Sequence, residues 1–224
     1  MTFAPSTAGT GTQRDHIGVW ARVLLIAGAL GAALAIVTVY AYYNDPWRPL
    51  AHSLGLWAVL ASAVGFRRLP ALAIGASIAS LAAAVVTYYV GLKVGHDIRW
   101  GGSGSVMRIN WDDIQLWLLL AVPVGVVFGL LGSFAPRRDW KGAGATAVVL
   151  GLLLGDAYRR FANWGGIDVV VTVDVLAAIA VFVIASRANK RPVLTLALTV
   201  ATAVLGFVVV SAPDFIEQGL IQGF

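Results

Sequence analysis

The chain has 224 residues, of which 59% are hydrophobic and only 12% are charged. A soluble domain carries about 25% charged residues, so this composition excludes a soluble globular domain and indicates a protein embedded in a lipid bilayer. The formal charge of +5 does not indicate nucleic-acid binding, because the basic residues lie in short segments between apolar runs, where they orient membrane proteins. The lack of cysteine excludes disulfides, thiol catalysis and thiolate metal sites.

Residues 1–16 are small and polar and predict a disordered cytoplasmic tail. The apolar run at about 20–43 is longer than the roughly 7–15 residues of a signal-peptide hydrophobic region, so we expect it to be a retained membrane anchor. Six further apolar runs follow at about 48–66, 70–93, 114–134, 142–159, 168–186 and 192–211. A bilayer core about 30 Å thick needs about 20 helical residues, with a lower limit near 17, and the second and fifth runs come closest to that limit.

The runs show no alternation of polar and apolar residues, which excludes membrane strands. We therefore predict an all-α, polytopic bundle of seven transmembrane helices over residues 17–211, in the cell (plasma) membrane. With the N-terminus inside and the C-terminus outside, the inner segments carry ten basic and two acidic residues, whereas the outer segments carry six basic and nine acidic ones. This is the asymmetry that the positive-inside rule expects. Residues 212–224 are predicted to form a short interfacial segment at the outer surface.

The aromatic residues are distributed unevenly along the predicted helices. All six tyrosines lie at predicted outer helix ends: Tyr40, Tyr42, Tyr43, Tyr88, Tyr89 and Tyr158. Rings of this kind favour the membrane–water interface, so one interpretation is an aromatic belt. Belts normally form on both faces, and the second interpretation is therefore an outward-facing pocket lined by aromatic rings.

Three ionisable residues fall near or inside the predicted outer half of the membrane. Asp174 lies about 9 Å along a helix beyond Asp168, a depth at which a carboxylate should face the bundle interior, a partner or a water-filled cavity. Asp156 precedes Arg159 and Arg160 by three and four residues, which places the charges on one helix face and also fits a simple salt bridge. Lys93 closes the third helix, where its ammonium group can equally reach the surface.

We expect Asp174, Asp156, Lys93, Tyr88 and Tyr89 to form a ligand-binding site if these side chains converge. Such a site would bind a small cation, a zwitterion or a lipid head group, or place two carboxylates for general acid catalysis. The residues indicate no catalytic set and no cofactor. The three histidines are too scattered along the chain to predict a metal site.

Three stretches resemble a family of small actinobacterial multi-pass membrane proteins that is known only as a domain of unknown function. They are Val86–Gly91, Val122–Gly132 and Gly151–Asp156. The resemblance covers most of the chain from the first helix to the seventh. It implies a membrane helix bundle and no activity.

Three functional hypotheses remain open at this stage. The first is a protein that binds or transports a small solute or lipid through an outward-facing pocket around Asp174 and Asp156; the depth of the charges and the clustered aromatic residues favour this non-enzymatic role. The second is a membrane-embedded enzyme that acts on a lipid or isoprenoid, in the manner of terpene cyclases. The third is a structural accessory subunit that contacts a membrane partner protein. In all three hypotheses the lipid bilayer is a partner, because it surrounds the protein.

Overall fold

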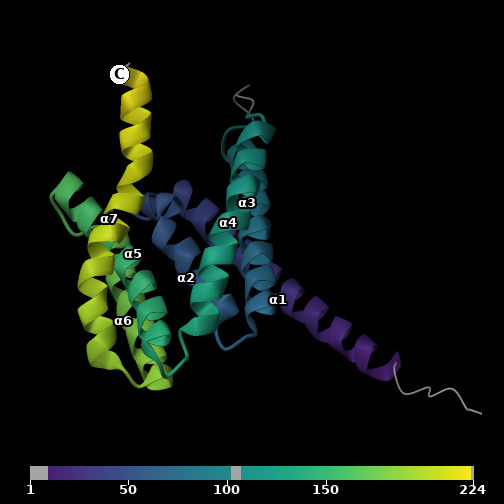
Figure 1. Ribbon diagram of the computed structural model, residues 1–224. Helices are drawn as coiled ribbons and strands as arrows, with labels where there is room; N and C mark the ends of the chain where they lie inside the picture. The colour runs from purple at the N-terminus through teal and green to yellow at the C-terminus, as the bar shows by residue number, and fades with distance from the viewer. Residues whose placement is uncertain (1–9, 102–106, 223–224) are drawn as a thin grey trace, which may run out of the picture.

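The computed structural model describes residues 10–101 and 107–222, and within these ranges all regular secondary structure is helical (Figure 1). Seven α-helices and one short 3-10 helix follow one another as α1 Thr10–Tyr42, η1 Arg48–His52, α2 Leu54–Gly65, α3 Pro70–Trp100, α4 Trp111–Phe134, α5 Trp140–Trp164, α6 Val169–Asn189 and α7 Pro192–Gln222. The predicted all-α class and the seven predicted helices are confirmed. The connections from α4 to α5, from α5 to α6 and from α6 to α7 are short, so each of these helices runs antiparallel to the next.

Five of the described helices are long and apolar enough to cross a membrane: α1, α3, α4, α6 and α7. The protein is therefore a multi-pass membrane protein. The other two helices correspond to the second and fifth predicted runs. α5 is long enough, with 25 residues, but it carries Asp156, Arg159 and Arg160 in its second half. α2 has only 12 residues, and at 1.5 Å per residue it covers about 18 Å of a core about 30 Å thick.

The predicted helix at 48–66 is wrong as one continuous span. Residues Arg48–His52 form the 3-10 helix η1, and Ser53 then adopts an extended backbone conformation that separates η1 from α2. Pro49 lies in the first turn of η1, where its missing N–H group and fixed φ angle are tolerated. The apolar composition of this run predicted one helix, and within the run only Pro49 indicated a break.

The two ends of the chain are helical beyond the predicted boundaries of the membrane domain. α1 begins at Thr10, within the predicted tail, while residues 1–9 lie outside the described part of the chain. α7 continues to Gln222, so residues 212–222 extend the last helix without a break. These residues coincide with the predicted interfacial segment, of which residues 223–224 are not described.

The helices form two groups of three, with α2 between them (Figure 1). In the first group α3 packs against both α1 and α4, and in the second group α5 packs against both α6 and α7. α2 contacts α3, α4 and α5, whereas η1 contacts α1 and α6. The short segment 43–65 therefore connects the two groups.

Small residues allow the helices of each group to pack closely. On α4, a Cβ added to Gly129 would lie 2.7 Å from the Cα of Ile74 on α3, as expected of the small-xxx-small pattern that Gly125 and Gly129 form. On α5, a Cβ added to Gly151 would lie 2.5 Å from Oγ1 of Thr202 on α7. The Thr202 hydroxyl donates a 2.6 Å hydrogen bond to the carbonyl oxygen of Ala147, which joins the same two helices.

Replacing Gly151 with alanine is expected to lower the melting temperature of the purified protein, because the added methyl group meets the backbone of α7. Overpacking of this kind costs about 1–3 kcal/mol. Gly144→Ala is the matched control on the same helix, since a Cβ at Gly144 meets no atom within 4 Å. Thermal unfolding in detergent, followed by circular dichroism, measures both variants. Equal melting temperatures for the two variants would contradict the close α5–α7 contact.

Candidate functional site

Charged and aromatic side chains gather at one end of the bundle, where α1, α3 and α5 finish and α4 and α6 begin. We call this the tyrosine end, because Tyr42, Tyr88 and Tyr158 lie there; it is the upper end in Figure 1. It corresponds to the predicted outer end. Asp156 lies about 24 Å along α5 from its start, and Asp174 about 23 Å along α6 from its end, so the two carboxylates reach a similar level.

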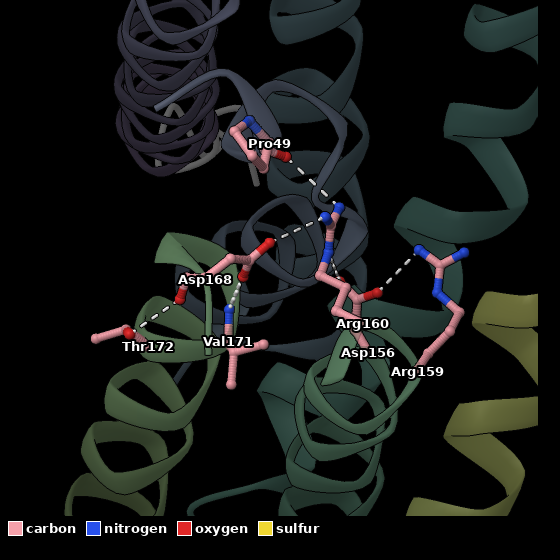
Figure 2. Close-up of polar contacts among 7 residues, drawn as sticks. All are labelled: Pro49, Asp156, Arg159, Arg160, Asp168, Val171 and Thr172. Atoms are coloured by element: carbon pink, nitrogen blue, oxygen red, sulfur yellow. Dashed lines mark hydrogen bonds and ion pairs between the residues drawn. The ribbon is translucent and has the colours of Figure 1, made fainter. Parts of the chain in front are cut away.

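Asp156 is fully buried and forms ion pairs with two arginines of its own helix (Figure 2). Nη2 of Arg159 donates a 3.1 Å hydrogen bond to Oδ1 of Asp156, and Nε of Arg160 lies 3.9 Å from Oδ2. Arg159 is only 7% exposed and Arg160 only 5%. The predicted placement of these three charges on one helix face is confirmed, and the residues form a buried cluster.

Arg160 extends this cluster to two other segments (Figure 2). Its Nη1 lies 3.8 Å from Oδ2 of Asp168, and its Nη2 donates a 3.5 Å hydrogen bond to the carbonyl oxygen of Pro49 in η1. Asp168 is itself the N-cap of α6, where Oδ1 accepts a 2.8 Å hydrogen bond from the backbone N–H of Val171. One guanidinium group therefore connects α5, the start of α6 and η1.

Asp174 of α6 is fully buried next to Asp156. Its charged neighbours are Asp156, Arg160 and Asp168. It also touches the first turn of α2, since a Cβ added to Gly55 would lie 2.7 Å from its Oδ1. Among the described residues, no donor forms a hydrogen bond with either oxygen of Asp174.

A cavity of about 1110 Å³ lies at the tyrosine end between the two helix groups. The short helix α2 contributes Leu54, Trp57 and Ala58 to its lining, and η1 contributes Arg48, Pro49 and Ala51. Its aromatic lining residues are Tyr42, Trp57, Tyr88, Tyr89, Trp117 and Phe128. Its charged lining residues are Asp45, Arg48, Arg159, Arg160 and Asp168.

The structure divides the tyrosines between the two interpretations of the sequence. Tyr88 and Tyr89 line the cavity and meet edge to face, with ring centroids 5.7 Å apart, and Trp57 of α2 packs against Tyr88 in the same way. Tyr40 and Tyr158 are 65% and 61% exposed, as belt residues would be. The tyrosine end therefore contains both exposed tyrosines, as a belt would have, and tyrosines that line a cavity.

The five predicted site residues separate into three sets. Asp156 and Asp174 lie together, Tyr88 and Tyr89 line the cavity, and Lys93 does not join them. Lys93 forms an ion pair with Asp97 one turn further along α3, where both side chains are more than a third exposed. Neither Asp156 nor Asp174 lines the cavity, whereas their neighbours Arg159 and Arg160 do.

Sequence reasoning missed several residues of this site. Arg159 and Arg160 were considered only as ion-pair partners of the two aspartates, and Arg48 and Trp57 were not proposed as site residues. The available signal was the segment 44–52, in which two prolines, at 46 and 49, stand among polar residues and disfavour a continuous helix. In the described part of the chain, no three His, Cys, Asp or Glu side chains are grouped so that they could hold a metal ion.

A protein-family model described as "Family of unknown function (DUF6518)" matches residues 14–215, which include all seven helices. This is consistent with the predicted resemblance to a family of unknown function. No curated protein and no solved structure matches the chain.

Asp156→Asn is expected to destabilise the protein strongly, because it removes the buried carboxylate that forms ion pairs with both Arg159 and Arg160. Removing one partner of a buried ion pair costs about 3–5 kcal/mol. Asp97→Asn is the matched control, because it removes the exposed ion pair with Lys93 and should change stability little. Thermal unfolding of both variants in the same detergent measures the difference. A melting temperature for Asp156→Asn equal to that of Asp97→Asn would contradict the structural importance of the cluster.

Proposed function

We propose that this chain, which belongs to the DUF6518 family, binds a lipid-like amphipathic molecule in the cavity at the tyrosine end. The observation that carries the proposal is the size and chemistry of that cavity. Small-molecule sites are typically concave, about 300–1,000 Å³ in volume and mostly apolar, with a few polar groups that orient the ligand. A cavity of about 1110 Å³ with a largely apolar lining fits this description.

The two walls of the cavity differ in chemistry, and this difference supports an amphipathic ligand. The wall from α3 and α4 presents apolar side chains, including Leu81, Val85 and Leu120. The opposite wall presents the guanidinium groups of Arg159 and Arg160 from α5. An apolar chain would pack against the first wall, while a phosphate or carboxylate head group would accept charge-assisted hydrogen bonds from the second.

Arg48 adds a third guanidinium group to the charged side of the cavity. It lies in η1, with its Cζ 5.5 Å from the centroid of the Tyr42 ring. Asp45 and Asp168 also line the cavity, so its charged side has three cations and two anions. An anionic or zwitterionic head group suits this balance better than a cationic one.

The enzyme hypothesis receives less support from this geometry. General acid catalysis requires a carboxyl group within hydrogen-bond reach of the substrate. Asp156 and Asp174 do not line the cavity, and Asp156 is occupied by ion pairs with Arg159 and Arg160. We therefore propose binding of an intact amphipathic molecule.

Filling the cavity should abolish binding of such a molecule. Leu120→Trp places a bulkier ring at a lining position and is expected to reduce photo-crosslinking to a diazirine-bearing phosphatidic acid by at least tenfold, as for the loss of about 1.4 kcal/mol or more of binding free energy. Leu119→Trp is the control, because the adjacent Leu119 is 70% exposed and does not line the cavity. The measurement is labelling yield in nanodiscs at equal protein concentration. Equal labelling of the two variants would overturn the proposal.

A further inference from the structure

One of the two buried carboxylates in this cluster lacks an ion pair. Asp156 and Asp174 are both fully buried. Asp156 forms ion pairs with Arg159 and Arg160, whereas among the described residues no ion pair reaches Asp174. An ionised Asp174 would therefore be a buried negative charge without an ion pair, in a setting where such a charge is costly.

The hydrogen bonds of the two adjacent carboxylates are also incomplete. Oδ1 of Asp156 accepts a hydrogen bond from Arg159, whereas Oδ2 of Asp156 accepts none from any described residue. Both oxygens of Asp174 are likewise without a donor in the described ranges. Neighbouring ionised carboxylates supply acceptors only, so a donor hydrogen is missing for these oxygens.

We infer that Asp156 and Asp174 together bind one proton, which is carried by Asp174 and donated to Oδ2 of Asp156. The proton supplies the missing donor hydrogen and removes the buried negative charge of Asp174. Asp156 remains ionised and keeps its ion pairs with Arg159 and Arg160. The site is separate from the amphipathic-ligand cavity, and the inference does not rest on that ligand.

The groups that face Asp174 from the surrounding elements are consistent with this assignment. From α5, Asp156 disfavours a second negative charge, and Arg160 is already shared between Asp156 and Asp168. From α6, Asp168 adds further negative charge. From α2, the first turn near Gly55 contributes a partial positive charge of about half a unit, which would offset only part of the negative charge of an ionised Asp174. In the described part of α7, no titratable side chain faces the pair.

The proton site has a consequence for the cavity through Arg160. This residue pairs with Asp156 and also lines the cavity wall. Loss of the proton would add a negative charge beside Arg160 and draw its guanidinium group toward the two carboxylates. The protonation state of the pair is thereby coupled to the positive charge that the cavity presents.

Infrared spectroscopy of the purified, lipid-reconstituted protein tests the inference directly. The wild-type protein is expected to show the carbonyl band of a protonated carboxyl group near neutral pH, and this band should disappear on alkalinisation. Asp174→Asn should lack the band, because its amide N–H replaces the acid O–H as the donor to Asp156. Asp97→Asn, which alters an exposed carboxylate, should retain it.

Thermal unfolding provides the second measurement. Deprotonation would leave two negative charges in contact, so the wild-type melting temperature should fall as the pH rises through the alkaline range, whereas that of Asp174→Asn should not show this fall. Absence of the carboxyl band from wild type would overturn the inference. The inference would also be overturned if sodium, but not choline, raised the wild-type melting temperature, because a metal cation would then occupy the site. Failure of Asp174→Asn to fold would also overturn it, since the amide reproduces the proposed hydrogen bond.

Discussion

The short helix α2 is the constraint on which the rest of the structure depends. It begins between the two helix groups, so its first turn and the irregular backbone just before it, including the buried Ala51 and Ser53, lie inside the protein. Non-helical backbone at membrane depth is stable only where it is buried in protein or lines a polar cavity. The buried charges of α5 and α6 meet this requirement: Arg160 donates to the carbonyl oxygen of Pro49, and Asp174 lies against the positive end of α2.

The same constraint explains why α5 carries charges that would be unfavourable in a lipid-facing helix. α5 is surrounded by α2, α4, α6 and α7, and residues such as Ala147 and Leu153 are completely buried. Asp156, Arg159 and Arg160 lie on the buried face of this helix and so face protein instead of hydrocarbon. They can therefore form ion pairs within the bundle, and Arg160 contacts η1 through the carbonyl oxygen of Pro49.

Cavity and charge cluster share a wall and differ in their chemistry. Arg159 and Arg160 belong to both, since their guanidinium groups line the cavity and pair with Asp156. The carboxylates lie behind this wall and have no lining surface of their own. This arrangement separates a region suited to an apolar chain and an anionic head group from a region suited to a proton, and connects them through one helix.

Hydropathy and spacing in the sequence were sufficient for the helical class, for the number of helices and for the pairing of Asp156 with Arg159 and Arg160. These properties are local, because a helix and its i,i+3 and i,i+4 contacts depend on residues close together in the chain. The sequence did not predict the break at Ser53 or the pairing of Lys93 with Asp97. It offered the meeting of Asp156 with Asp174 only as a condition for a binding site. Lys93 had the correct depth for the site, but α3 continues to Trp100 and presents Asp97 one turn away.

The sequence by itself thus determined a multi-helix membrane protein with buried charge near one end of the bundle, since length, apolarity and charge spacing are properties of each segment alone. Only the tertiary structure decided which charges meet and where space remains. Asp156 and Asp174 come from different helices, and their contact depends on how α5 packs against α6. The cavity depends on the length of α2 relative to the helices on either side of it, a comparison that no single segment contains.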